Sequence, residues 1–289
     1  MPARNEAWVV GLSARVALLW CDELVILNHN SVDATVDILD ELQFEFPGRA
    51  HVVSVPGEQW TEMEHRQFML ELARAKGATH IAIVDADEIL TGNLVQFVFQ
   101  SARCLRPAQI LQLPGFNLRG GIDRFHLNGI WGQRWFSTAF RDDDRLHWAK
   151  VVRGSVQEEH HQREPLGMPL HRHRPIAQNG GGVMHLWGAN ERRLIAKHAW
   201  YKVTEAIKYP AKPRADIDSM YSLAIKGSAH DLPKNWSYQK VPSEWWTPYA
   251  HLMKYLDIDA VPWQEREVWR LTAAHPAETF RGLDLFGVI

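Results

Sequence analysis

Hydrophobic side chains in the first third of the chain follow two spacings, one typical of helices and the other of strands. The helical spacing, or a long apolar run, is found at residues 7–20, 34–44 and 59–76. Short apolar runs rich in β-branched residues lie between and after these segments, at residues 23–28, 51–55 and 79–84. Because helices and strands alternate at short intervals, we predict an α/β fold with a doubly wound, mainly parallel sheet flanked by helices.

The rest of the chain divides into a loop-rich middle and a helical end. Glycine pairs and clusters of Arg, His and Asp separate aromatic residues between 109 and 182, which favours strands and long loops. Helical spacing then returns at residues 191–207, 215–226, 243–256 and 264–274. We predict a main domain of residues 1–189, with halves at 1–108 and 109–189, and a helical C-terminal region of residues 190–289 packed on it.

The composition excludes several classes of protein. With 46% hydrophobic and 23% charged residues among 289, the chain is too apolar for intrinsic disorder. A formal net charge of -2 lacks the basic excess of a dedicated non-specific nucleic-acid binder. Two cysteines, Cys21 and Cys104, are too few for a disulfide framework or a cysteine zinc site. Because neither a membrane-spanning apolar run nor a signal peptide is present, we expect a cytoplasmic protein without a membrane span.

The sharpest chemical signal is Asp85-Ala86-Asp87-Glu88, which directly follows the apolar strand at residues 79–84. Ligands of α/β sheets bind beyond the carboxyl ends of the strands, so Asp85 and Asp87 are expected to enter that crevice. Paired carboxylates form a hard oxygen site that suits Mn²⁺ or Mg²⁺ and leaves positions open for phosphate oxygens. The alternative is an acidic loop whose carboxylates cap the following helix.

Two polar segments nearer the N-terminus fall where a nucleotide crevice would need them. Asn28, His29 and Asp33 belong to a polar turn that follows the strand at residues 23–28 and opens a helix. Such a turn presents amides and backbone N–H groups to a base, a ribose or a phosphate. Arg4 precedes the first helix, where its guanidinium could bind a diphosphate through two hydrogen bonds. The alternatives are a plain turn with Asp33 as N-cap, and a solvated terminal arginine.

Three segments, taken in order, resemble the nucleotide-sugar-binding half of family 2 glycosyltransferases with the GT-A fold. They are ARNEA, VILNHNSVDAT and HRQFMLELARAKGATHIAIVDADE, and they cover about residues 3–95. They match an N-E opening, a D-x-x-S-x-D-x-T turn and a D-x-D metal motif that ends a strand. The resemblance implies a GT-A fold, a nucleotide-diphosphate sugar as donor with a UDP-sugar favoured, Mn²⁺ or Mg²⁺ as cofactor, and inversion at the anomeric carbon.

The resemblance also implies roles for individual residues. Asp85 would lie near the ribose and the metal, Asp87 would coordinate the metal, and Arg66 would lie close to the nucleotide. The nucleotide-sugar site would further include the N-terminal block and the turn, that is Arg4, Asn5, Glu6, Asn28, His29 and Asp33. The family commonly begins this turn with an aspartate that reads the base, so Asn28 and His29 leave the base open. The family also has a first strand before its N-E block, and we expect a weakened edge of the nucleotide site here.

Residues farther along the chain are candidates for completing the reaction centre. His185 lies on a glycine-hinged strand, in a region where GT-A enzymes often place a histidine that completes the metal shell; the alternative is a core histidine. Arg193 and Lys197 follow on a predicted helix, where they could neutralise the leaving diphosphate. Inverting transfer needs a base for the acceptor hydroxyl, and the candidates are Asp123, Asp142 and Glu191.

Other functions stay open at this level. A nucleotidyltransferase can share the nucleotide half and the carboxylates, although its Gly-rich basic loop is missing here. A catalytically degenerate sugar-nucleotide or glycan-binding module is a second alternative. The acceptor is unknown, and a saccharide or a hydroxymethylated DNA base would fit. The histidines of His160-His161 and of His171-Arg172-His173 could suggest a zinc site, but a cationic loop is the better interpretation.

Overall fold

The computed structural model describes residues 1–57, 60–132, 134–153, 156–158, 163–167, 171–175, 180–228 and 230–289. The chain forms two compact units, each assembled from segments that are distant in the sequence. Unit 1 consists of Met1–Gly115, Arg134–Met184 and Pro242–Asp257, and unit 2 of Phe116–Gln133, His185–Val241 and Ile258–Ile289. The predicted boundary after residue 189 lies near one observed transition, but it misassigns segments 116–133 and 242–257. Periodicity finds helices and strands, whereas long-range contacts decide which unit each one joins.

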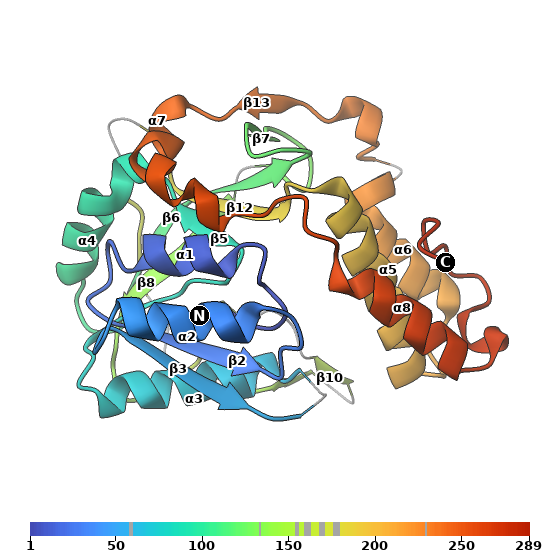
Figure 1. Cartoon of the computed structure of the whole chain (residues 1–289), viewed down its shortest axis with the longest axis horizontal. Coiled ribbons are helices and arrows are strands. Elements are labelled where there is room, and N and C mark those ends of the chain that lie inside the picture. The colour runs from blue at the N-terminus through green and yellow to red at the C-terminus, as the bar shows by residue number, and fades with distance from the viewer. Residues whose placement is uncertain are drawn as a thin grey trace. The chain divides into compact units, whose positions relative to one another are not determined.

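Unit 1 starts with a parallel sheet of three strands in the order β1-β2-β3. These are β1 (Pro2–Ala3), β2 (Leu24–His29) and β3 (Ala50–Val55). They alternate with α1 (Val10–Ala17), α2 (Thr35–Glu45) and α3 (Glu62–Ala75), and the predicted α/β alternation is confirmed here (Figure 1). Crossover helices are needed because the chain must return to the same end of the sheet before the next parallel strand begins.

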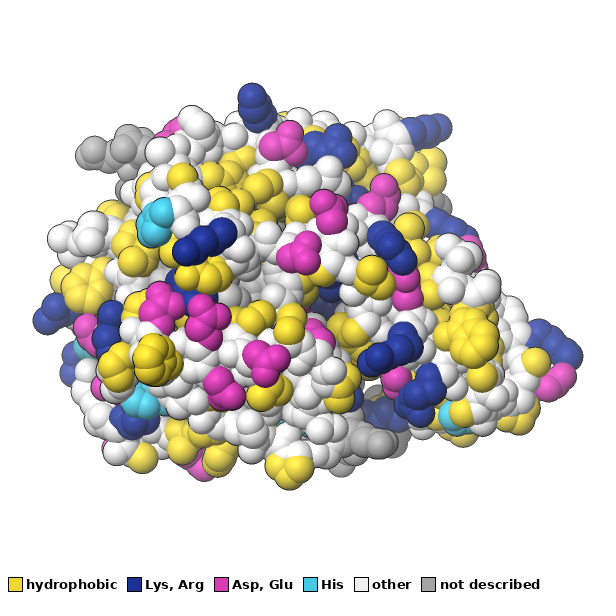
Figure 2. Space-filling view, viewed as in Figure 1, with side chains coloured by type: hydrophobic (Ala, Val, Ile, Leu, Met, Phe, Trp, Pro, Cys, Tyr) yellow, Lys and Arg dark blue, Asp and Glu magenta, His cyan; other side chains and the backbone are white. Residues whose placement is uncertain are grey.

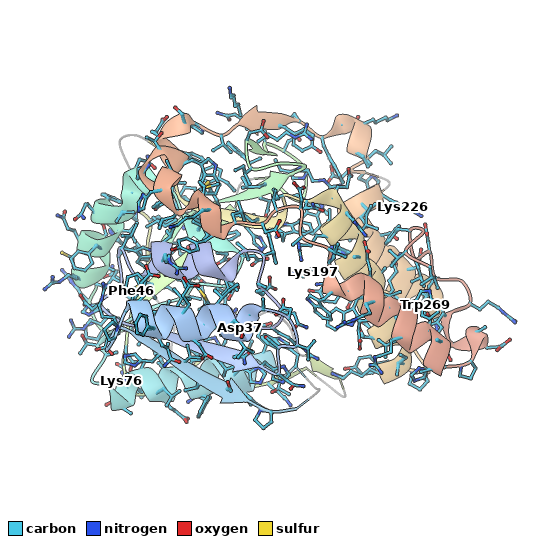
Figure 3. All side chains as sticks on the ribbon, in the orientation of Figure 1. Asp37, Phe46, Lys76, Lys197, Lys226 and Trp269 are labelled. Atoms are coloured by element: carbon cyan, nitrogen blue, oxygen red, sulfur yellow. The ribbon has the colours of Figure 1, made fainter. Side chains whose placement is uncertain are left out.

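Helix α2 illustrates how the sequence pattern sets burial. Leu39 and Leu42 are buried, whereas Asp37 and Asp40 are exposed. Figure 2 shows acidic side chains gathered over this part of the surface, and Figure 3 shows Asp37 on the outer side of the helix. The buried guanidinium of Arg15 in α1 donates to Glu45 of α2 at 2.9 Å, so an ion pair ties the two helices together.

The other strands of unit 1 pair mostly antiparallel. β4 (His80–Ala82) pairs with β8 (Arg134–Arg141), and β8 pairs in the same sense with β6 (Gln109–Arg119). β11 (His171–His173) lies parallel to β6. The prediction of a mainly parallel sheet is therefore wrong outside β1, β2 and β3. An apolar run indicates an extended segment but carries no information about the direction of its neighbour.

Strand β4 also differs from the fully covered central strand that the sequence predicts. Its three residues are only half-buried, and its register places β8 along one edge. The ladder continues on that edge beyond the strand, because Asp142 N–H donates to Thr79 O at 2.9 Å and Ile83 N–H donates to Thr138 O at 2.8 Å. β4 belongs to the sheet of β6 and β8, which is separate from the β1-β2-β3 sheet.

Further elements complete unit 1. They are β5 (Glu88–Leu90), η1 (Gly92–Leu94), α4 (Val95–Arg103), β9 (Val151–Arg153), β10 (Val156–Glu158), α7 (Ser243–Trp246) and η3 (Thr247–Tyr255). Tyr249 is buried, and its hydroxyl donates to the Leu90 carbonyl at 2.9 Å. This bond ties the late segment to β5, which directly follows the acidic motif.

Unit 2 contains most of the predicted C-terminal helices. Its elements are β7 (Arg124–His126), most of β12 (Val183–Gly188), α5 (Glu191–Lys208), α6 (Arg214–Lys226), η2 (Pro233–Asn235), β13 (Tyr238–Lys240), α8 (Trp263–Ala274) and η4 (Ala277–Phe280). Lys202 is fully buried on α5, where Nζ donates to Asp218 at 2.7 Å and Ser222 at 2.9 Å. These partners compensate its desolvation. Within the described part of the chain, no helix combines the length and apolar character needed to cross a membrane.

The segment after the acidic motif is anchored at Thr91. Its Oγ1 accepts from Gly182 N–H at 3.1 Å, and its own N–H donates to Gly182 O at 2.8 Å. Gly181 has a φ of 100°, and a Cβ there would lie 2.5 Å from Thr91 Oγ1. Glycine at position 181 therefore allows the backbone to pack directly against Thr91, where any side chain would clash.

We expect Thr91→Val to lower the free energy of unfolding by about 1–3 kcal/mol, because the buried Gly182 N–H loses its acceptor. Thr91→Ser keeps the hydroxyl and should stay closer to the wild type. Urea unfolding followed by circular dichroism measures both variants. Equal losses in the two variants would show that packing of the Thr91 methyl group, and not the hydrogen bond, carries the effect.

Candidate functional site

The N-terminal segment and the turn after β2 hold each other through backbone and side-chain bonds. Asn5 N–H donates to Ser31 Oγ at 2.9 Å, and Asn5 Oδ1 accepts from Val32 N–H at 2.7 Å. Glu6 N–H donates to Thr35 Oγ1 at 2.8 Å. Asn5 adopts a φ of 54°, a left-handed conformation that asparagine tolerates better than most residues. Two of the three segments that carry the resemblance therefore meet at the carboxyl ends of β1 and β2.

Asn28 and Asp33 shape this turn. Asn28 Oδ1 accepts from Ser31 N–H, and Nδ2 donates to Ser54 Oγ, both at 3.3 Å. Asp33 is not the N-cap of α2, because that position is held by Ala34. Its two oxygens instead accept from Thr35 N–H at 3.0 Å and Ala7 N–H at 3.3 Å. These contacts make both residues supports of the turn.

An aromatic cluster lies at the carboxyl ends of β2 and β3. The ring of His29 lies 5.3 Å from Trp60 and 4.7 Å from His65, and Trp60 lies 4.9 Å from His65. The Arg4 guanidinium is 3.5 Å from His29 Nδ1. Burial lowers the pKa of His65, so this ring is neutral at neutral pH. Sequence reasoning missed Trp60 and His65 as site residues. Their position just after the strand predicted at residues 51–55 could have indicated them, because ligands bind beyond the carboxyl ends of strands.

The acidic motif is held by two arginines. Arg66 on α3 donates to Asp85 Oδ1 at 2.9 Å and to Glu62 at 2.9 Å. Arg163 donates to both oxygens of Glu88, at 2.6 and 2.7 Å, and its NH1 lies 3.4 Å from Asp85 Oδ2. The Asp85 N–H also donates to Glu88 at 3.1 Å. The turn is therefore fixed by ion pairs as well as by its backbone.

Charge rather than burial decides the protonation of Asp85. Burial by itself would raise the pKa of this carboxyl group, and the neighbouring charge of Asp87 acts in the same direction. The guanidiniums of Arg66 and Arg163 outweigh both effects and bring the pKa to about 2. The carboxylate is therefore ionised at neutral pH, which is the form that can bind a cation.

Sequence reasoning also missed Arg163, which lies 75 residues beyond Glu88. Its Nε donates to Ser137 O at 2.6 Å and its NH2 to Ile83 O at 3.0 Å. The next residue, Glu164, accepts from Gln112 at 2.8 Å and Ser137 at 2.7 Å. Bonds to strands β6 and β8 thus position Arg163 beside the acidic turn. No local sequence pattern predicts that Arg163 pairs with Glu88.

The donor chemistry of the turn fits a divalent cation. Among the residues that the structure describes, no group of three or more His, Cys, Asp or Glu side chains is arranged as a metal cage. Asp85 is ionised, and Asp87 lies close enough for its charge to act on it. Mg²⁺ in nucleotide sites commonly takes one or two carboxylates and completes its shell with water and substrate phosphates. Asp85 and Asp87 match that pattern.

Asp142 does not join this cluster. It follows β8 and lies beside the start of β4, where its N–H donates to Thr79 O, whereas Asp85 follows the opposite end of β4. Arg74 donates to both of its oxygens, at 2.7 and 2.9 Å, and its side chain is 7% exposed. The carboxylate is thus held in a partly buried ion pair, and its expected role as the base for the acceptor hydroxyl stays a prediction.

The remaining expected residues belong to unit 2. His185 Nδ1 lies 3.0 Å from Asn117 Oδ1, which also accepts from Trp187 at 2.9 Å. Arg193 is buried and donates to Ala260 O at 2.9 Å. The others are Asp123, which is exposed, Glu191, which lies 3.5 Å from Arg119, and Lys197 on α5 (Figure 3). Arg193 is thus engaged inside its own unit, and the roles of the others stay predictions.

The zinc alternative gains no support from the described residues. His171 and His173 are exposed, as expected of a solvated segment, but they lie on strand β11 and not in a loop. His160 and His161 lie outside the residues that the structure describes.

Comparison with known proteins adds no assignment. No protein-family model matches the chain, and no curated protein matches it either.

Asp85→Asn is expected to reduce stability at neutral pH, and the deficit should shrink as the pH falls. The folded-state pKa lies below the ordinary aspartate value, so the contribution of Asp85 is complete above about pH 4 and disappears toward about pH 2. The deficit at neutral pH should be about 2 kcal/mol. Urea unfolding at neutral and acidic pH measures it.

Asp37→Asn provides the matched control, because it makes the same change at an exposed carboxylate of α2. That variant should differ little from the wild type at either pH. A deficit of Asp85→Asn that stays constant down to the lowest pH at which the protein folds would contradict the assignment.

Proposed function

We propose that this chain is a metal-dependent glycosyltransferase that moves a sugar from a nucleotide-diphosphate sugar to an acceptor hydroxyl. The observation that carries the proposal is the pair His65 and Arg66 at the start of α3. His65 packs in the aromatic cluster with His29, and Arg66 binds Asp85. The aromatic cluster and the acidic turn are therefore linked through two adjacent residues of one helix. A nucleotide-diphosphate ligand needs such an arrangement, because its base and its diphosphate lie at opposite ends.

The aromatic cluster is the part that would take the base. Trp60 is partly exposed beside the buried, neutral ring of His65, and stacking on an aromatic face tolerates any base. Arg4 lies beside His29 and brings a positive charge to the same place. Asn5, Glu6, Asn28 and Asp33 act in this proposal by holding the turn that positions His29.

The acidic turn is the part that would take the diphosphate and its cation. Asp85 and Asp87 bring two carboxylates to this turn, and Arg66 and Arg163 keep Asp85 ionised. Asp85 and Asp87 would hold Mn²⁺ or Mg²⁺, which stabilises the negative charge of a leaving diphosphate when bound. Arg163 lies against the same carboxylates, and a bound diphosphate would offer its guanidinium a second anionic partner.

The acceptor side of the proposal rests on unit 2. Asp123 and Glu191 are exposed carboxylates that can accept a proton from an acceptor hydroxyl during direct displacement. Lys197 and His185, for which the resemblance implies roles toward the diphosphate and the metal, also belong to unit 2, and these roles stay predictions. The acceptor itself, a saccharide or a hydroxymethylated DNA base, is not specified by any contact within the described residues.

One observation favours a second candidate, a nucleotide-binding module without catalysis. Asp85 and Glu88 are both paired with guanidiniums, so the turn is stable without a cation. Such a module would bind nucleotide with equal affinity in the presence and absence of metal. Metal dependence of binding therefore separates the two candidates.

Thermal unfolding with UDP, GDP, CDP or ADP, each with and without Mn²⁺, tests the proposal. A ligand at about 100 times its Kd adds about 2.7 kcal/mol, which raises the midpoint by several degrees in a chain of this size. We expect one nucleotide to stabilise the protein only when Mn²⁺ is present. Equal stabilisation with and without Mn²⁺ would favour the binding module. If no nucleotide stabilises the protein, both candidates are overturned.

Asp87→Asn should remove the Mn²⁺-dependent part of this stabilisation, because it deletes one of the two carboxylates that would hold the cation. Asp142→Asn makes the same change in the ion pair with Arg74 and should keep the Mn²⁺ dependence, although the unliganded protein will be less stable. The change in midpoint on adding ligand is compared within each variant. Loss of Mn²⁺ dependence in both variants would mean that the site is not specific to Asp87.

Trp60→Ala should weaken nucleotide binding, because a stacked base contributes about 1–3 kcal/mol, or roughly 5- to 150-fold in Kd. Trp269→Ala is the matched control, since Trp269 is 67% exposed on α8 in unit 2. Isothermal titration with the stabilising nucleotide measures both. Equal affinities in the wild type and Trp60→Ala would show that the aromatic cluster does not hold the base.

A further inference from the structure

Strand β3 is the edge strand of the three-stranded sheet in unit 1. Among the described residues it pairs with β2 alone, in an unbroken parallel register from Ala50 to Val55, and Figure 1 shows it on the outer side of β2. Natural proteins usually protect an edge strand with lysine, proline, a bulge or a covering element. The six residues of β3 include neither lysine nor proline, and their register has no shift. The edge is therefore suited to pairing with a further strand.

Val52 and Ser54 direct their backbone groups away from β2. Leu24 pairs with Ala50, and its N–H donates to Arg49 O, so the parallel ladder bonds the odd-numbered residues of β3 to β2. Successive residues of a strand direct their N–H and C=O groups to opposite sides, so those of the even-numbered residues point outward. Within the described part of the chain, no other strand bonds to that side.

The outward edge is complementary to a second copy of itself. In an antiparallel arrangement centred on Val53, Val52 of one copy faces Ser54 of the other, and each such pair exchanges two hydrogen bonds. Val53 then faces Val53 in a close pair without hydrogen bonds, where β-branched side chains pack well. His51 faces Val55, so this register brings no like charges together.

Helix α3 covers one face of this edge. The register pairs Val55 with His29, and the ring of His29 packs on His65 of α3. Side chains at alternate positions of a strand share a face, so Val53 lies on the α3 side together with Val55. Both valines are only half-buried, which leaves apolar surface beside the open edge.

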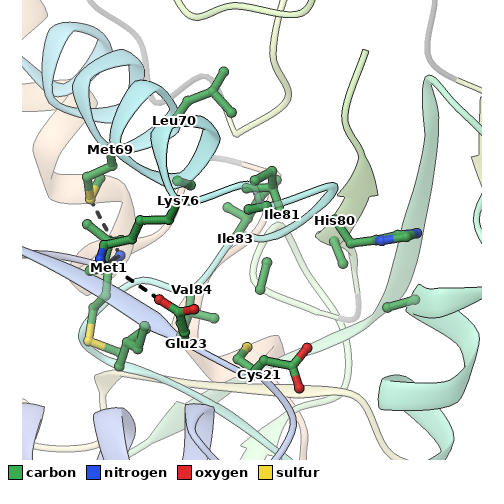
Figure 4. Close-up of a pocket in the computed structure, with 18 of the residues that line it drawn as sticks. Met1, Cys21, Glu23, Met69, Leu70, Lys76, His80, Ile81, Ile83 and Val84 are labelled. Carbon is green, nitrogen blue, oxygen red and sulfur yellow. Dashed lines mark hydrogen bonds and ion pairs between the residues drawn. The ribbon is translucent and has the colours of Figure 1, made fainter. Parts of the chain in front are cut away.

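The same helix carries an exposed aromatic side chain. Toward β4, α3 borders a cavity of about 360 Å³, where Figure 4 shows Met69 and Leu70. Leu72 lies about 200° around the helix from Leu70, and Phe68 lies one turn before Leu72 on the same flank. This flank faces away from the cavity, and Phe68 is 40% exposed there. A second copy paired through β3 would bring its own α3 alongside and cover the ring.

We propose that two copies of this chain associate through β3, antiparallel about Val53, so that their β1-β2-β3 sheets form one continuous sheet. The interface is isologous, because a two-fold axis places the same strand on both sides. Its strand pairing would be completed by the exposed flank of α3 around Phe68. The inference does not depend on the proposed function.

Sedimentation equilibrium of the full chain over a range of concentrations measures the association. Val53→Lys places two like charges opposite each other, as does Val53→Glu, and each should raise the dissociation constant of the dimer about tenfold or more. Val261→Lys makes the same change at a valine that is 67% exposed in unit 2, and it should leave the constant unchanged. A wild-type chain that stays monomeric at its highest soluble concentration would overturn the proposal, as would a dimer that Val53→Lys leaves intact.

A mixture of Val53→Lys and Val53→Glu tests the two-fold register itself. Opposite charges then face each other at the centre of the strand pair, so the mixture should form a dimer that neither variant forms alone. Circular dichroism of each variant confirms that it is folded before mixing. Folded variants that do not associate on mixing would show that Val53 does not face itself, and the proposal would fail.

Val53→Cys keeps the proposal testable if a charge at this position prevents folding. Close antiparallel pairs hold their Cα atoms about 4.5 Å apart, a distance that a disulfide can span. In a Cys104→Ser background, which removes the exposed thiol, mild oxidation should convert Val53→Cys into a covalent dimer. Val261→Cys in the same background should stay monomeric on a non-reducing gel. Equal crosslinking of the two variants, or none in either, would overturn the proposal.

Discussion

The candidate site depends on the ion pair between Arg66 and Asp85. Arg66 is buried, and desolvation opposes its charge, yet Asp85 and Glu62 raise its pKa above the usual value. Removing either partner would leave the charge of the other uncompensated, and loss of the Asp85 charge alone should cost about 2 kcal/mol. The pair therefore fixes the start of α3 against the end of β4, and this contact sets the positions of both His65 and the acidic turn.

The same interaction explains how the site can be stable and still receptive to a cation. Arg66 and Arg163 hold Asp85 ionised, and Arg163 also neutralises Glu88. Asp87 adds a second carboxylate, whose charge acts on Asp85. Asp85 is therefore already ionised and held in place before a metal binds. Folding, and not metal binding, supplies the free energy that orders this carboxylate.

A cavity lies between β2 and β4, the two strands that lead into the candidate site. β4 ends at the acidic motif, and β2 ends at the turn that carries His29. The amino-terminal half of β2 and the whole of β4 line this cavity. The strands that lead to the aromatic cluster and to the acidic turn are therefore separated by a cavity along this stretch.

The sequence by itself determined the elements and the place of the carboxylates. Apolar spacing located β2, β3 and the helices from α1 to α3, and an apolar run followed by acidic residues located Asp85 and Asp87. Tertiary structure alone decided the rest: the antiparallel pairing of β4 with β8, the arrival of Arg163 from 78 residues beyond Asp85, and the capture of Asp142 by Arg74. The physical reason is that periodicity reports which side of a segment is buried. Strand direction and ion-pair partners depend instead on contacts between segments that are distant in the chain.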